Sequence, residues 1–181
     1  MNDIESIFRK LACAFCRFPD DLRVSYAESN QSIIVVYTAH ADDTRKLIGK
    51  GGAMYKALET VLAAVTARRR LKSRLIVDEP HTGQPLETVR FETNTNWTET
   101  RVRMLMIEIC MLLFTEQPEI TFHRISTDAS TLLLQVGETE VWGDVKVEDL
   151  SQALSRIFEA IGRNQGRKIF VEISVDRCHN R

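Results

Sequence analysis

The sequence predicts an α+β fold made of two tandem units, each with the order α-β-β-α-α-β and each a three-stranded sheet packed on helices. Two observations lead to this fold class. Helical patterns of apolar residues alternate with short runs rich in β-branched residues, and the same order of patterns occurs twice. The composition, 44% hydrophobic and 27% charged over 181 residues, is that of a folded chain long enough for one or two domains.

A helix and a hairpin open the chain. Apolar residues follow helical spacing over residues 4–18, and Pro19 ends the run. Residues 23–27 and 32–39 are rich in β-branched and aromatic side chains, with a polar stretch between them. This pattern predicts two strands joined by a tight turn.

Two adjacent helices and a strand complete the first unit. Asp42 and Asp43 favour the start of a short helix, because acidic residues stabilise a first turn, and this helix ends at Gly49. Residues 53–69 predict a longer amphipathic helix, and residues 73–78 predict the last strand.

The second half repeats the plan. Its predicted elements are a helix at 100–115, strands at 119–126 and 131–137, a helix at 147–161 and a strand at 168–175. A shift of 96 positions places Ala57 and Leu58 on Ala153 and Leu154, which favours a duplication. We therefore expect a first domain at 1–79, a linker at 80–97 and a second domain at 98–181.

Charge is divided unevenly between the halves. The net charge is −1, yet residues 1–80 carry 13 basic and 10 acidic side chains, whereas residues 81–181 carry 11 and 15. A surface that binds phosphates is therefore expected in the first half.

A Gly-Lys-Gly-Gly loop, Gly49 to Gly52, lies in that basic half between the two adjacent helices. Glycine lets a loop approach a phosphodiester backbone closely, and Lys50 adds a positive charge. A Walker loop needs four residues between its glycines and then Gly-Lys-Ser/Thr, and a dinucleotide fingerprint must follow a strand directly, so neither fits. An ordinary helix-turn-helix bend remains the structural alternative.

The element order, the loop and Lys56-Ala57-Leu58 together resemble a type II KH domain, most closely the small bacterial KH proteins of the KhpA type, over roughly residues 3–79. The resemblance implies a narrow groove that holds about four nucleotides of single-stranded RNA or DNA. Carried over by position, the resemblance implies that the nucleic-acid backbone is contacted by Gly49, Lys50, Gly51 and Gly52. It implies that Ile48 lines the floor of the groove, and that positive charge is added by Arg45, Lys46 and Lys56. Ala53 and Met54 depart from the usual basic residue and isoleucine, which predicts a lower affinity.

The second half lacks this loop. Its glycines Gly137 and Gly143 are six positions apart, and the charged residues around them are mostly acidic. This half is therefore interpreted as a degenerate KH-like domain whose charge would repel phosphates. Trp142 could anchor an interface or fill the domain's own core.

The leading functional hypothesis is non-catalytic binding of single-stranded RNA by the first domain, with the second domain serving stability or partner contact. The alternative is a protein-interaction adaptor or dimerisation protein built on KH folds that no longer bind RNA. An enzyme is the weakest hypothesis, because no nucleophile–base or metal-ligand spacing is present.

We expect no cofactor, and the close pair Cys13 and Cys16 is interpreted as core packing rather than a zinc or redox site. The expected partners are single-stranded RNA and either another KH protein or a second copy of this chain. No apolar run approaches the roughly 20 residues that span a bilayer, so a cytoplasmic protein without membrane contact is expected.

Overall fold

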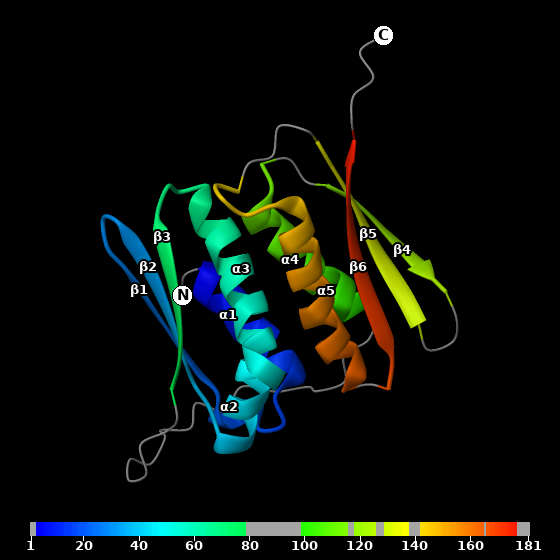
Figure 1. The fold of residues 1–181 in the computed structure, drawn as a ribbon. Helices are drawn as coiled ribbons and strands as arrows, with labels where there is room; N and C mark the ends of the chain where they lie inside the picture. Colours follow the sequence, from blue (N-terminus) through cyan, green and yellow to red (C-terminus); the bar gives the residue numbers. More distant parts are fainter. Residues whose placement is uncertain are drawn as a thin grey trace.

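The computed structural model describes residues 3–78, 99–115, 118–125, 129–137, 142–164 and 166–176. The first half contains α1 (Asp3–Phe15), β1 (Arg23–Glu28), β2 (Ser32–Thr38), α2 (Ala41–Ile48), α3 (Ala53–Ala67) and β3 (Lys72–Asp78). The second contains α4 (Glu99–Leu113), β4 (Glu119–Arg124), β5 (Ala129–Gly137), α5 (Val147–Arg163) and β6 (Lys168–Asp176). The predicted α+β class, with two three-stranded sheets packed on helices, is confirmed (Figure 1).

Two details differ from the sequence prediction. The first helix ends at Phe15 rather than at residue 18, because the backbone N–H groups of Arg17 and Phe18 donate to the Asp43 carboxylate instead of to carbonyls of the helix. In the second half, the described residues between β5 and α5 form a turn at Gly143 and contain no counterpart of α2. The predicted linker, 80–97, lies outside the described residues.

Both sheets have the same topology. The strand orders are β1-β2-β3 and β4-β5-β6, with an antiparallel hairpin followed by a parallel pair in each. In the central strand β2, Ile33, Val35 and Tyr37 are buried and alternate with partly exposed neighbours. This alternation follows from the two-residue period of a strand with one face on the core.

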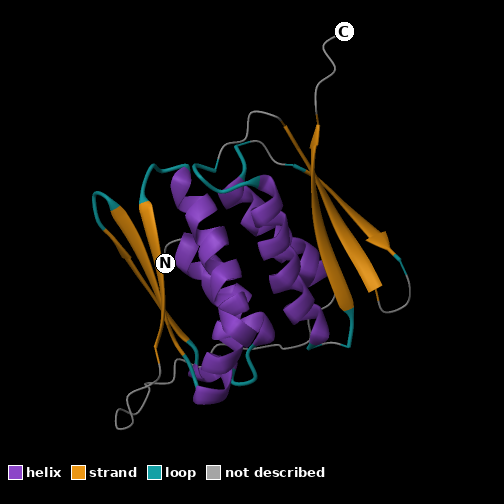
Figure 2. Ribbon diagram, in the orientation of Figure 1, coloured by secondary structure: helices purple, strands orange, loops and turns teal. Residues whose placement is uncertain are grey.

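The helices lie between the two sheets. The long helices α1, α3, α4 and α5 lie in the middle of the molecule, with one sheet on each outer side (Figure 1, Figure 2). α3 packs against α5, and α1 packs against α4 and α5, so both halves contribute to one hydrophobic core. α3 and α5 run in opposite directions: Ala53 lies near the C-terminal end of α5, and Ala67 lies near the turn at Gly143 that precedes α5.

Polar contacts also join the halves. Arg68 Nη1, at the end of α3, donates to the carbonyl oxygens of Leu112 at 3.1 Å and Phe114 at 2.7 Å, which lie at the end of α4. These carbonyls are orphaned by the helix end, so the arginine satisfies groups that a helix cannot satisfy itself.

Trp142 is buried in the core. Its indole Nε1 donates to the carbonyl of Leu113 at 2.7 Å, and its ring meets Phe114 edge to face at 5.4 Å. Of the two readings of this tryptophan, core packing is the one that the structure supports.

Candidate nucleic-acid interface

The helix before the glycine loop is short, and two side chains hold its N-terminal end. His40 Nδ1 accepts from the backbone N–H of Asp42 at 3.2 Å, and Thr44 Oγ1 donates to the carbonyl of Ala39 at 3.1 Å. An eight-residue helix has little stability in isolation, so such caps and tertiary contacts must hold it.

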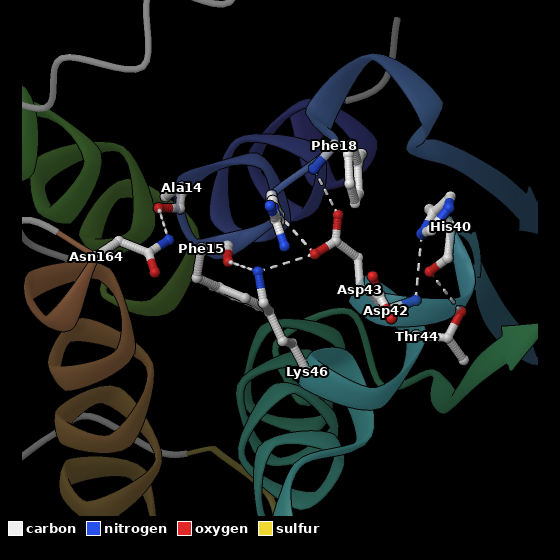
Figure 3. A network of polar contacts seen from close by, with 10 residues as sticks. Ala14, Phe15, Phe18, His40, Asp42, Asp43, Thr44, Lys46 and Asn164 are labelled. Atoms are coloured by element: carbon white, nitrogen blue, oxygen red, sulfur yellow. Dashed lines mark hydrogen bonds and ion pairs between the residues drawn. The ribbon is translucent and has the colours of Figure 1, made fainter.

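Asp43 attaches this helix to the end of α1 (Figure 3). Its carboxylate is fully buried and accepts from the backbone N–H groups of Arg17 and Phe18, each at 2.7 Å. Lys46, one turn further along α2, pairs with the same carboxylate at 3.0 Å and donates to the carbonyl of Phe15 at 3.4 Å. The chain leaving α1 and the helix leading to the loop are thereby fixed to each other.

The pKa of the Asp43 carboxyl reflects this setting. Burial acts to raise that pKa, but the two backbone donors and the ammonium of Lys46 outweigh burial and hold the pKa below its ordinary value. Asp43 is therefore a charged structural residue at neutral pH.

Gly49 is required by the backbone and by its neighbour. Its φ of 73° and ψ of 171° lie in a region that is essentially restricted to glycine. A Cβ at this position would also lie 2.8 Å from the backbone nitrogen of Met54 and 2.9 Å from its Cβ. This first glycine therefore lets the chain turn sharply from α2 into α3.

The other two glycines have a different role. Gly51 and Gly52 have φ values of 62° and 76°, and a Cβ on either would meet nothing within 4 Å. No packing within the described protein demands glycine at these two positions. The outer side of the loop is bare backbone open to the surroundings, which suits close approach by another backbone.

The predicted site residues all lie on α2, the loop and the start of α3. Arg45, Lys50 and Lys56 are exposed and form no ion pair with a described residue. Ile48 is an apolar side chain with 41% of its surface exposed beside these cations. Lys46 differs from the other three cations, because its ammonium is already engaged by Asp43.

A hollow of about 480 Å³ lies beside the loop. Arg45, Lys46, Gly49 and Lys50 line it from the first half, so the structure brings these predicted residues together, whereas Lys56 lies on a second hollow of about 620 Å³. The sequence did not point to the opposite wall, which consists of Arg156, Glu159, Ala160 and Arg163 of α5 and of Asn164, the residue after it. Only the packing of α5 on α3 reveals this wall.

Cys13, Cys16 and Cys110 are free thiols in the described part of the chain. Cys16 and Cys110 are buried, and burial is the main cause that raises their pKa values, for Cys110 to about 12. No group of three or more His, Cys, Asp or Glu residues among the described positions could hold a metal ion. None of the described helices combines the length and the apolar character needed to cross a bilayer.

Comparison with known proteins adds a family assignment. Residues 5–77 match the family model described as KhpA/KhpB, KH domain. A protein of Halalkalibacterium halodurans named RNA-binding protein KhpA is 34% identical over 76 residues, which are 41% of this chain and 100% of that protein.

Two further relatives carry the same name. The protein from Bacillus subtilis is 34% identical over 61 residues, 34% of this chain and 75% of its own length. The protein from Mycobacterium bovis is 40% identical over 50 residues, 28% of this chain and 62% of its own length. With the loop geometry and the order of elements in its first half, the chain belongs to the KhpA/KhpB family of KH-domain proteins.

Proposed function

We propose that this protein binds single-stranded RNA, without catalysing a reaction, through the glycine loop and the adjoining groove of its first 79 residues. The observation that carries the proposal is the open outer face of Gly51 and Gly52, flanked by the cations Lys50 and Arg45, which form no ion pair with a residue that the structure describes. Positive charge beside exposed backbone suits a phosphodiester chain. The name of the relatives, RNA-binding protein, supports the same function.

The proposed role of each side chain follows from its surroundings. Gly51 and Gly52 lie against the RNA backbone, and Lys50 and Arg45 neutralise phosphates. Ile48 offers an apolar surface on which a base can rest, because its side chain is exposed beside the loop. Lys46 positions α2 through Asp43 and contributes its charge only in part.

The second segment, 98–181, supports the first in this proposal. Its helices complete the core that α1 and α3 share, which stabilises the elements that carry the loop. A protein partner, either another KH protein or a second copy of the chain, would raise affinity by joining sites. A single short groove with few charges is expected to bind with a dissociation constant of about 1 μM or weaker.

The test is a titration of a labelled single-stranded oligouridine of about 12 nucleotides, followed by fluorescence anisotropy at about 50 mM and about 200 mM salt. The loop variant carries Lys50→Asp and Gly51→Asp. Its matched control carries Lys72→Asp and Asn30→Asp, which change the net charge equally at exposed positions near the opposite end of α3.

We expect salt-sensitive binding by the wild type and the control, and its loss in the loop variant. The loop variant should still unfold cooperatively, at a melting temperature lowered by a few degrees because position 51 has a positive φ. Equal binding by all three proteins would refute the assignment of the groove. Absence of binding by the wild type would favour the adaptor function instead.

A further inference from the structure

We infer that the C-terminal end of α5 forms a second wall of the nucleic-acid site, so that Arg156 and Arg163 bind the phosphodiester backbone together with the glycine loop. This inference rests on the proposed function. It assigns to the second half a direct part in binding, although that half contains no Gly-x-x-Gly sequence.

The two walls face each other across one hollow. The 480 Å³ hollow beside the loop is lined by α2, the loop and α3 on one side and by the last turns of α5 on the other. Five of its lining side chains are basic and one is acidic: Arg45, Lys46, Lys50, Arg156 and Arg163 against Glu159. A hollow with this excess of positive charge attracts a polyanion.

Both walls are attached to the end of α1. Lys46 donates to the carbonyl of Phe15, and Asn164, the residue after α5, donates to the carbonyl of Ala14 at 3.4 Å (Figure 3). Two consecutive carbonyls of one helix end therefore hold α2 from the first half and the end of α5 from the second. Such shared support fixes the distance between the two sets of cations.

The charges of α5 are sorted along its length. Asp144, Glu148 and Asp149 lie at or before its first turn, and the arginines lie toward its last turns. Since α5 runs opposite to α3, the acidic end lies away from the loop and the basic end lies beside it. These acidic side chains of the second half, which would repel phosphates, therefore lie at the end of α5 that is far from the loop.

The second hollow shows where the attractive surface ends. It continues along α3 and α5, where Lys56 and Arg156 are outnumbered by Glu59, Asp144 and Asp149. A strand leaving the loop is therefore expected to cross onto the last turns of α5 rather than to follow the seam between α3 and α5.

The two arginines are accessible for this role. Arg156 is exposed and forms no ion pair with any residue that the structure describes. Arg163 pairs with Glu159 at 2.9 Å, four residues away on the same helix face, but both side chains are well exposed, at 76% and 48%. An exposed pair of this kind is weak, and the guanidinium keeps further N–H donors for a phosphate.

The test compares two double variants. The α5 variant carries Arg156→Ala and Arg163→Ala, and the control carries Arg103→Ala and Lys146→Ala. All four side chains are exposed, and each double variant removes two positive charges from the second half. Arg103 lies on α4, and Lys146 precedes α5 at its acidic end. The full chain is titrated with the same oligouridine over a range of salt concentrations.

We expect the α5 variant to bind at least about tenfold more weakly than the control and to retain residual salt-sensitive binding through the loop. Each phosphate contact to a single strand contributes about 0.7 to the magnitude of the slope of log affinity against log salt concentration. Loss of two contacts should therefore reduce the magnitude of that slope by about 1.4. Cross-linking of a photoreactive RNA to wild-type protein should also label peptides from the end of α5.

The outcomes separate this inference from the proposed function. If the α5 variant and its control bind alike while the loop variant does not bind, the inference is overturned and the proposed function stands. If the wild type does not bind RNA, both are overturned. Cross-links confined to residues of the first half would also overturn the second wall, whatever the variants show.

Discussion

Replacing Asp43 with asparagine should destabilise the protein far more than the same change at Asp42, its neighbour on α2. Asp43 is fully buried and accepts two backbone N–H groups at 2.7 Å, whereas Asp42 is exposed. An amide in place of the carboxylate turns one acceptor into a donor, which leaves a buried N–H facing another N–H and removes the pairing with Lys46.

The magnitude follows from these contacts. Hydrogen bonds to charged groups contribute about 1.5–3 kcal/mol each, and an unsatisfied buried group costs about 1–3 kcal/mol. We therefore expect the free energy of unfolding to fall by about 2–4 kcal/mol, which lowers the melting temperature by about 5–15 °C in a protein of this size. Asp42→Asn should cost less than about 1 kcal/mol, through the weakened interaction with the helix dipole.

The assay is thermal unfolding followed by circular dichroism, with urea unfolding to obtain free energies. The pKa of Asp43 is lower in the folded protein than the ordinary value of about 3.9, so its stabilisation is present above that value and is lost as the pH falls through the folded pKa. The difference between wild type and Asp43→Asn should therefore be full at neutral pH and shrink in acid below about pH 4. Equal melting temperatures for the two variants at neutral pH would refute the reasoning.

Two further predictions concern the loop and the shared core. Gly49→Ala should lower the free energy of unfolding by about 2–5 kcal/mol, because the backbone conformation there excludes other residues and the new Cβ would meet Met54. Gly51→Ala should lower it by only about 1–2 kcal/mol, because its Cβ would meet nothing. Similar urea midpoints for the two variants would contradict this contrast. Trp142→Ala should cost about 3–5 kcal/mol through the lost core volume and the freed Leu113 carbonyl, and an unchanged midpoint would show that the indole is dispensable.

The sequence was sufficient for the features that depend on local chemistry. The order of elements in the first half followed from apolar periodicity, and the loop followed from glycines whose positive φ is a property of the residue itself. The early end of α1 was not predictable in this way, because Asp43, 25 residues or more away, captures the amides of Arg17 and Phe18. Apolar spacing beyond Phe15 continued to suggest a helix.

The second wall could not be predicted for a related reason. Arg156 and Arg163 lie more than 100 positions from the loop, in a half whose summed charge is negative. Only the antiparallel packing of α5 on α3 shows that its basic end lines the same hollow as the loop. The role of Lys46 did have a sequence signal: Asp43 and Lys46 are spaced as neighbours on one helix face, which favours a pair between them.

The shared core determines how the stability of the loop region responds to protein concentration. α4 and α5 cover faces of α1 and α3 from within the same polypeptide, so this packing is intramolecular and its stability does not depend on protein concentration. Two separate chains that met through such a surface would dissociate when they became scarce. Here the elements that carry the glycine loop keep their neighbours at any expression level, down to a single molecule.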